Sequence, residues 1–346
     1  MRNSEYSQPN FHEAPLNPVD SIGIIGANGQ VGTMLKQQMR TIPHHPAVYS
    51  VGRGDIEGLM ASRPKYVIAA TPKQATKEVL EEIVFYVKSP FTAFLFQNGV
   101  GVTDEAKRIL QKCPVDHSLI RGSLYTTVHR EGNNVEYNRK KLRLALYPVY
   151  IHESRLVEQA VGTFEDAGFN VKEFDDPESG EWTKLLANSI GSTSTVTGLT
   201  PFETFSDPLL FDIELRGLAE RLAIIKARGT QLLDLSWAQT GLIKKAAEFP
   251  QELLHFLRSP VASVIATKRG NLPSSAARKI ASGESPEEAL YYHLPFVEEA
   301  QRLGLPAVVD TTLARFIQYH LDGYQNLDFP KNVRRARLIE SINQYG

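Results

Sequence analysis

The sequence has a single cysteine, Cys113, among its 346 residues. One cysteine cannot form a disulfide within the chain, and such a sequence suits a reducing compartment. The nine histidines are scattered, and no cysteine–histidine set has the spacing of a zinc site. We therefore expect a cytoplasmic protein without a bound metal.

The sequence also lacks an excess of either charge and lacks long apolar runs. The 38 lysines and arginines nearly balance the 39 aspartates and glutamates, which gives no electrostatic reason to expect binding to nucleic acid or to an anionic membrane. The apolar runs Tyr66–Ala70 and Phe91–Phe96 are long enough for strands only. Residues 1–20 lack the apolar centre of a signal peptide. We expect them to form a flexible tail.

The length of the chain exceeds what one core comfortably holds and favours two domains. Strand-like and helix-like segments alternate up to residue 174, and a polar segment with proline and glycine follows at 175–180. Beyond it the pattern predicts helices, with a capping box at Thr200–Glu203 and a loop at 268–284. The predicted helices cover 181–196, 203–235, 239–257, 259–268, 286–303 and 308–322. We expect an α/β domain over 21–178 and a helical domain over 179–346.

A glycine-rich turn follows the first predicted strand, Ser21–Gly26, and precedes a predicted helix at 30–40. Glycine lets the backbone approach a pyrophosphate, and a helix N-terminus offers unpaired N–H groups. The spacing is G-x-x-G-x-x-G, which differs from the dinucleotide fingerprint G-x-G-x-x-G, and a turn of this kind can also serve geometry alone. The turn predicts a dinucleotide site. Its expected residues are Gly26, Asn28, Gly29 and Gly32.

Three polar residues follow predicted strands, where α/β proteins place ligand contacts. Arg53 stands where an NAD-preferring site would carry an acidic residue, and a guanidinium suits the 2′-phosphate of NADP instead. Lys73 is expected at a cofactor phosphate or ribose, and Asn98 at the nicotinamide. The alternatives are an exposed loop arginine at Arg53 and a simple turn residue before glycine at Asn98.

The segment from Glu181 to Ser194 carries the expected catalytic group. Its apolar residues recur at helical spacing, whereas Lys184, Asn188 and Ser192 recur every four residues on the opposite side. A buried ammonium gives up its proton easily, as a proton donor must. The alternative is a solvated helix face on which the lysine extends its charged end into water.

A second lysine pattern is a chance match. Tyr137 and Lys141 form Tyr-x-x-x-Lys, the catalytic pair of short-chain reductases. That pair needs a helix to bring both side chains to one face. The segment follows a turn at Asn133–Asn134 between two predicted strands, 121–132 and 142–147, and alternates like a strand.

Together these segments resemble ketopantoate reductase, a family of 2-oxoacid reductases, over about residues 20–325. The matching segments are Asn98–Gly101, Thr126–Gly132 and Glu181–Asn188. The resemblance implies an N-terminal Rossmann-type dinucleotide-binding domain and an all-α C-terminal domain like that of 6-phosphogluconate dehydrogenase. It implies NADPH-dependent reduction of a 2-oxoacid, ketopantoate or a related branched one, as the activity.

The resemblance also implies roles for individual residues. Lys184 takes the place of the catalytic lysine and Asn188 that of a substrate-binding asparagine. Ser263 matches a substrate-binding serine, and Glu288 matches an acidic residue that fixes Lys184 or the nicotinamide ribose. The implied contacts to NADP are Arg53, Lys73 and Asn98.

Three features depart from the family. The glycine turn has an extra residue, and the interval from Ser263 to Glu288 is longer than usual. Two substrate-binding asparagines are replaced, at Ser192–Thr193 and at Pro201–Glu203, with Ser192 left as the expected substrate contact. Two functions therefore compete with 2-oxoacid reduction: a 3-hydroxyacid or 6-phosphogluconate-type dehydrogenase, and a noncatalytic NADP-binding redox sensor. The long apolar helices suit a homodimer or a monomer with a tight interdomain core.

Overall fold

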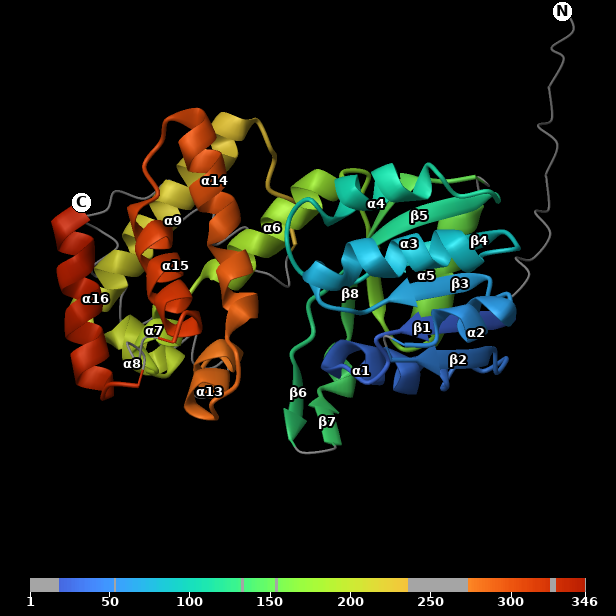
Figure 1. Ribbon diagram of the computed structural model, residues 1–346, viewed down its shortest axis with the longest axis horizontal. Helices are drawn as coiled ribbons and strands as arrows, with labels where there is room; N and C mark the ends of the chain where they lie inside the picture. The colour runs from blue at the N-terminus through green and yellow to red at the C-terminus, as the bar shows by residue number, and fades with distance from the viewer. Residues whose placement is uncertain are drawn as a thin grey trace, which may run out of the picture.

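The computed structural model describes residues 19–52, 54–131, 134–152, 155–235, 273–323 and 328–345. These residues form two parts, a sheet covered by helices and a group of helices, and helix α6 (Pro177–Ser189) runs between them (Figure 1). The predicted fold class, an α/β part followed by an all-α part, is confirmed. Within the described residues, none of the helices has the length and apolar character that a bilayer crossing requires.

The main sheet has seven strands in the order β2-β1-β3-β4-β5-β8-β9. Strands β1 to β5 are mutually parallel, β8 runs antiparallel to β5, and β9 runs parallel to β8. The strand order reverses at β1, so the crevice at the carboxyl ends of β1 and β3 is the place where such sheets bind ligands. The strands are β1 (Ser21–Ile25), β2 (Ala47–Val51), β3 (Tyr66–Ala69), β4 (Phe91–Leu95), β5 (His117–Leu124), β8 (Arg143–Tyr150) and β9 (Asn170–Glu173).

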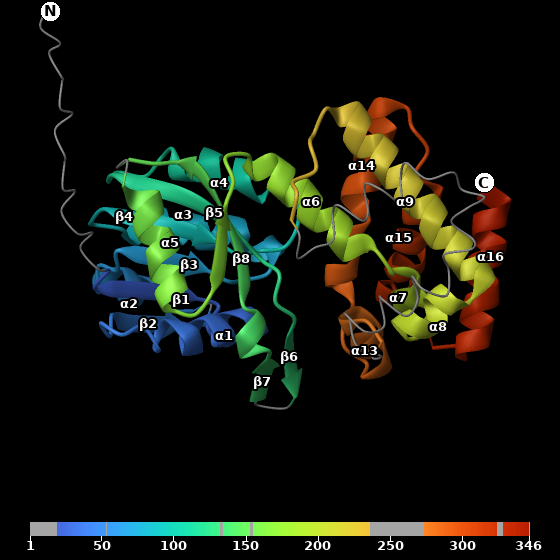
Figure 2. The ribbon, with the colours of Figure 1, turned by 180° about the vertical axis from the view of Figure 1, so that it is seen from behind.

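Helices cover both faces of this sheet, as Figures 1 and 2 show from opposite sides. One face packs on α1 (Gln30–Met39) and α5 (Leu156–Asp166). The other packs on α2 (Ile56–Ala61), on α3 (Thr76–Tyr86) with its preceding 3-10 turn η1 (Lys73–Ala75), and on α4 (Val102–Leu110). Because both faces are covered, the central strands are buried along their whole length, which is why their sequences are almost entirely hydrophobic.

A two-stranded hairpin leaves the sheet after β5. It consists of β6 (Val128–Glu131) and β7 (Asn134–Tyr137), so the prediction of one strand over 121–132 is wrong. The second predicted strand, 142–147, is confirmed within β8. The chance-match interpretation of Tyr137 and Lys141 is confirmed, because the tyrosine lies in β7 and the lysine in the 3-10 turn η2 (Arg139–Lys141). The hairpin packs against α1.

Helix α6 begins four residues earlier than predicted. Asp176 accepts a hydrogen bond from the backbone N–H of Ser179 at 3.0 Å, and Pro177 occupies the first turn. The predicted helix over 181–196 is also wrong at its end, because Ile190 adopts an extended ψ of 129°. A separate short helix, α7 (Thr193–Thr197), follows.

The remaining helices differ from prediction at their ends. The capping box at Thr200–Glu203 is confirmed at the start of α8, but Asp207 then caps a new helix, so 203–235 is not one helix. The predicted loop at 268–284 contains a helix that Ser274 caps. The predicted helices 239–257 and 259–268 lie outside the described residues. The elements are α8 (Pro201–Ser206), α9 (Pro208–Arg228), α13 (Ser275–Ala281), η4 (Glu287–Tyr292), α14 (Leu294–Leu303), α15 (Val308–Leu321) and α16 (Lys331–Tyr345).

Candidate active site

The glycine turn between β1 and α1 has the geometry of a phosphate-binding loop. Gly26 has a φ of +80°, and a Cβ atom there would lie 2.7 Å from the carbonyl oxygen of Ala70. A Cβ atom on Gly32 would lie 2.1 Å from the carbonyl oxygen of Gly26. Gly29 is the N-cap of α1 and supplies no side-chain cap, and the first turn of α1 holds no acidic residue. The free N–H groups and positive dipole of this helix end fit a phosphate.

Asn28 lies exposed in this turn, and its carbonyl oxygen accepts a hydrogen bond from the guanidinium of Arg130. Arg130 comes from β6, 102 residues further along the chain. Sequence reasoning missed this residue because no local pattern connects the two segments. The other expected cofactor residue near this turn, Arg53, lies outside the described residues, although Val51 at the end of β2 accepts a hydrogen bond from Ala27 of the turn at 3.0 Å.

Lys73 and Asn98 lie on neighbouring loops at the same edge of the sheet. The Lys73 ammonium donates to the carbonyl oxygen of Val100 at 2.8 Å and lies 5.6 Å from the centre of the Tyr291 ring. The Asn98 amide donates to the Glu288 carboxylate at 3.0 Å. The structure thus brings together Asn98 and Glu288, which are 190 residues apart.

The Glu288 carboxylate has two further contacts within the helical part. Tyr292 donates its hydroxyl to Oε1 at 3.1 Å, and the Lys279 ammonium lies 3.7 Å from Oε2. The carboxylate is about half exposed. It joins the sheet part to the helical part while remaining open to a ligand.

Lys184 is half-buried on α6, and its ammonium donates to the carbonyl oxygen of Leu124 at 2.6 Å. The same ammonium lies 4.2 Å from the centre of the Tyr125 ring. Burial beside Tyr147 holds the pKa of Tyr125 well above its ordinary value, so the ring remains neutral. Leu124 ends β5, and β5 is parallel to β1 and β4, so the ammonium lies at the edge of the sheet that carries the glycine turn and Asn98.

The three residues predicted on one face of α6 are not all on it. Asn188 lies one turn after Lys184 and is half-buried. Ser192 lies beyond the end of the helix, is buried, and donates its hydroxyl to the carbonyl oxygen of Ser189 at 2.7 Å. The prediction that Ser192 shares the face of Lys184 is wrong because the helix ends at Ser189. Ser263 lies outside the described residues.

A buried ion pair holds α6 against the sheet. Glu181 accepts hydrogen bonds from Arg121 Nε at 2.9 Å and from the backbone N–H of Gly101 at 2.8 Å. Thr103 donates to the same carboxylate through its N–H and its hydroxyl. The side chains of Arg121 and Glu181 are 2% and 3% exposed. Sequence reasoning placed Glu181 at the start of the helix but did not assign it this role, because its partners come from other elements.

A second buried network holds the other end of α6. Arg221 donates to Ser189 at the end of α6 and to Asp310 of α15, with 2.9 Å between Arg221 Nε and Asp310 Oδ2. His293, which follows η4, contacts the same carboxylate at 2.7 Å. Burial raises the pKa of Asp310, but Arg221 and His293 outweigh it, and the net shift is downward. The network therefore fixes the helix of Lys184 relative to η4, which carries Glu288.

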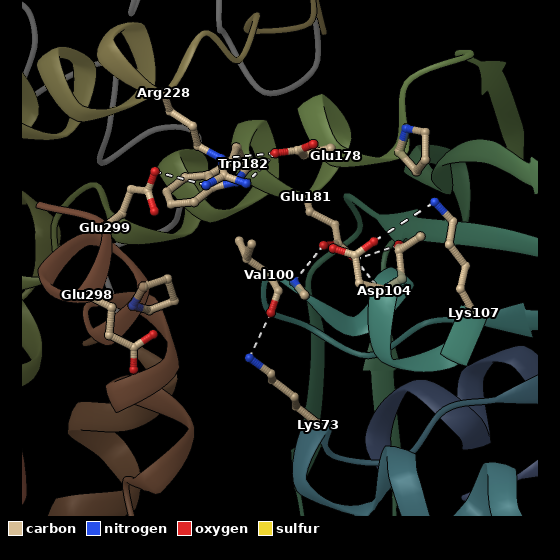
Figure 3. A pocket seen from close by; sticks show the side chains of 14 residues that line it. Lys73, Val100, Asp104, Lys107, Glu178, Glu181, Trp182, Arg228, Glu298 and Glu299 are labelled. Atoms are coloured by element: carbon tan, nitrogen blue, oxygen red, sulfur yellow. Dashed lines mark hydrogen bonds and ion pairs between the residues drawn. The ribbon is translucent and has the colours of Figure 1, made fainter. Parts of the chain in front are cut away.

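A pocket of about 290 Å³, which Glu181 helps to line, opens between α4, α6 and α14 (Figure 3). Arg228 crosses its rim, paired with Glu178 and Glu299. Lys184, Asn188 and Glu288 do not line it, so we do not assign it to the substrate. The residues that line this pocket include Lys73, Val100, Gly101, Thr103, Lys107, Glu181 and Trp182.

Among the residues that the structure covers, no three histidine, cysteine or acidic side chains are grouped as a metal site would need.

Solved structures with this fold include several oxidoreductases. A ketopantoate reductase of the PanE/ApbA family from Ralstonia eutropha JMP134 is 17% identical, with a TM-score of 0.66 over 88% of this chain and 99% of that one. A ternary complex of D-mandelate dehydrogenase with NADH and anilino(oxo)acetate is 11% identical, with the same TM-score and coverage. A dimeric ketopantoate reductase from Staphylococcus aureus is 16% identical, with a TM-score of 0.59 over 89% and 99% of the two chains.

Comparisons by sequence find nothing similar: no protein-family model matches the chain, and no curated protein does. The similarity is therefore one of structure. It extends over nearly the whole length of each of the three relatives and includes both the sheet and the helical part. The chain has the fold of the ketopantoate reductases.

Proposed function

We propose that this protein reduces a 2-oxoacid to the 2-hydroxyacid with NADPH. One observation carries the proposal: the half-buried Lys184 places its ammonium at the carboxyl edge of the parallel sheet, the edge that also carries Asn98 and the glycine turn. Relatives with this fold support the proposal: they include a ketopantoate reductase and a D-mandelate dehydrogenase in a ternary structure with NADH and anilino(oxo)acetate.

The glycine turn fits a dinucleotide. Gly26 and Gly32 allow the turn to pack tightly against Ala70 and against itself, and α1 presents uncapped N–H groups at the end of that turn. When bound, the nicotinamide supplies the hydride. We assign the cofactor as NADPH rather than NADH because Arg53 follows β2 at the position where an acidic residue would select NAD. Lys73 and Asn98 complete the expected cofactor contacts.

Lys184 is the proposed proton donor. Its ammonium stabilises negative charge as it develops on the carbonyl oxygen of the substrate and transfers a proton to that oxygen. The carbonyl of Leu124 and the ring of Tyr125 help to hold the ammonium in place. Asn188, one turn along the same helix, is the proposed contact to the polar groups of the substrate.

Glu288 is the proposed partner of the nicotinamide ribose, since its carboxylate already accepts from Asn98 across the domain boundary. Ser263 is proposed as a further substrate contact from its position in the sequence. Ser192 is weakened as a candidate because its hydroxyl proton is committed to a backbone carbonyl, so it cannot donate to a substrate hydroxyl as an asparagine would. The substrate therefore need not be ketopantoate itself.

NADPH oxidation with ketopantoate and a panel of branched 2-oxoacids tests the activity, with NADH run in parallel. The variant Lys184→Ala should lower kcat by about 100- to 10,000-fold and leave the Kd for NADPH within about twofold, because the lysine contacts substrate and not the cofactor phosphates. The matched control is Lys226→Ala on α9, which is exposed and should change neither value. If Lys184→Ala has the same kcat as the wild type, Lys184 is not the proton donor.

Two other outcomes would favour the competing functions. Oxidation of a hydroxyacid with NADP, without reduction of any 2-oxoacid, would indicate a 3-hydroxyacid or 6-phosphogluconate-type dehydrogenase. Tight NADPH binding without turnover of any substrate would indicate a redox sensor.

We also propose a homodimer, by analogy with the dimeric relative. Exposed apolar residues at the start of the helical part, Phe202 and Leu209, suit such an interface, and light scattering would measure the mass.

A further inference from the structure

Arg130 reaches the glycine turn from a separate element, the β6–β7 hairpin. Its guanidinium donates through Nη2 to the carbonyl oxygen of Asn28 and lies 3.4 Å from the hydroxyl of Thr33 in the first turn of α1. Figures 1 and 2 both show the hairpin beside α1. The contact places a positive charge directly at the turn that precedes α1.

The guanidinium has donors to spare. Arginine carries five N–H donors, and in the part of the chain that the structure describes only those on Nη2 have hydrogen-bond acceptors. The side chain is exposed, and no ion pair with a described carboxylate occupies it. Arg130 therefore anchors itself with one nitrogen and keeps its remaining N–H groups for a ligand.

The surroundings of the guanidinium favour an anion. The N-terminus of α1 has no side-chain cap and no acidic residue in its first turn, so its N–H groups and dipole add positive potential beside Arg130. Gly26 and Gly32, where a Cβ atom would collide with backbone carbonyl oxygens, belong to the same tightly packed turn. Two independent features, a helix end and a guanidinium from another element, thus converge on one place.

The hairpin holds Arg130 firmly. Tyr137 of β7 accepts from the Gln38 amide at 2.8 Å and donates to Gln37 at 2.8 Å, which fixes the hairpin on α1. On the other side, Arg278 of α13 contacts Nδ1 of His129 at 2.9 Å. The neighbour of Arg130 is therefore tied to the helical part, and the guanidinium needs little ordering before it can bind a ligand.

We propose that Arg130 is a pyrophosphate-binding residue, which the hairpin brings to the glycine turn. The proposal rests on the dinucleotide site of the proposed function. We assign the pyrophosphate and not the 2′-phosphate because Arg130 contacts the turn at Asn28 and Thr33, at the start of α1. The 2′-phosphate is expected at the end of β2. Gly52, at that end, lies beside the side chain of Asn28, whereas Arg130 contacts the backbone carbonyl of Asn28. A guanidinium binds a pyrophosphate through paired N–H groups, which a lysine cannot reproduce.

Equilibrium binding tests the proposal without relying on turnover. The Kd values of NADPH, NADH and 2′-AMP are measured by fluorescence or calorimetry for the wild type, Arg130→Gln and Arg130→Lys. The control is Arg139→Gln, an exposed arginine of η2 whose guanidinium lies 5.9 Å from the Tyr137 ring and has no contact with the turn. Melting temperatures of all four proteins establish that the variants are folded.

We expect Arg130→Gln to raise the Kd of NADPH and of NADH by the same factor, roughly 10- to 100-fold, since each loses charge-assisted hydrogen bonds to the pyrophosphate. The Kd of 2′-AMP, which has no pyrophosphate, should change by less than about threefold. The dinucleotide Kd values of Arg130→Lys should lie between those of the wild type and those of Arg130→Gln. Unchanged dinucleotide affinities, or a loss confined to NADPH and 2′-AMP, would overturn the assignment while leaving the proposed function intact. If the wild type binds neither NADPH nor NADH, both the assignment of Arg130 and the proposed function are overturned.

Discussion

The substitution Glu181→Gln tests whether the buried ion pair between α6 and the sheet supports the fold. The carboxylate accepts four hydrogen bonds, from Arg121, Gly101 and twice from Thr103. Glutamine is nearly the same size, but it removes the charge and turns an NH₂ group toward some of these donors. The Arg121 guanidinium is 2% exposed and would retain backbone carbonyls, and at most an uncharged amide oxygen, as acceptors.

Removing one partner of a buried pair costs about 3–5 kcal/mol, because the other charge remains buried without compensation. The matched control is Glu178→Gln, one turn earlier on the same helix. The Glu178 side chain is 56% exposed, and its partner Arg228 keeps Glu299. Exposed pairs contribute about 0–1 kcal/mol, so the two variants should differ by several kcal/mol in the free energy of unfolding.

Urea unfolding at pH 7, followed by circular dichroism, measures both free energies, and comparable m-values would show that the same surface is exposed in each protein. We expect Glu181→Gln to unfold at a clearly lower urea concentration than Glu178→Gln. If Glu181→Gln loses less than about 1 kcal/mol, or no more than the control, then the pair does not support α6 and the reasoning fails.

Three further predictions concern the turn, the second buried network and the hairpin. Gly32→Ala should weaken NADPH binding and lower the free energy of unfolding by about 1–3 kcal/mol, because its Cβ atom would lie 2.1 Å from a backbone oxygen of the turn; calorimetry that finds normal affinity would contradict this. The lowered pKa of Asp310 means that its pairing with Arg221 stabilises the protein above about pH 4, the unfolded value, and is lost as the pH falls toward the folded pKa. The free energy of unfolding of Asp310→Asn should therefore be lower at pH 7 and vary less between pH 7 and pH 3 than that of the wild type. If the free energies of the two proteins change in parallel with pH, Asp310 does not cause this pH dependence. Burial, and then Arg278, lower the pKa of His129, so Arg278→Gln should raise that pKa toward its ordinary value of 6.5 in an NMR titration, and no change would show that the contact is absent in solution.

The features that the sequence predicted correctly are local. The parallel strands and the glycine turn follow from apolar runs bounded by glycine, and the Lys184–Asn188 face follows from a spacing of four on a helix. The start of α6 was also encoded locally. Asp176 is an N-cap residue and Pro177 lies in the first turn, which is a helix-start signal. The polar composition of segment 175–180, taken alone, favours a linker.

What the sequence could not predict depends on contacts between distant segments. The hairpin separates from β5 because β8, not β6, pairs with β5, and strand pairing of this kind has no local signal. Arg130 reaches a turn 102 residues away, and Glu181 bonds residues 60 and 80 positions earlier. Ser192 was misplaced because the spacing of four continues past Ser189, whereas the helix does not.

The position of α6 has a consequence for dividing the molecule. By sequence, this helix opens the helical part, but by packing it contacts β5 and β8 of the sheet as well as η4. A fragment that ended at residue 178 would enclose the Arg121 guanidinium without the carboxylate that neutralises it. The shortest fragment of the sheet part that keeps this charge paired therefore extends through Ser189. Any chimera that exchanges helical parts between relatives should be joined after α6 instead of before it.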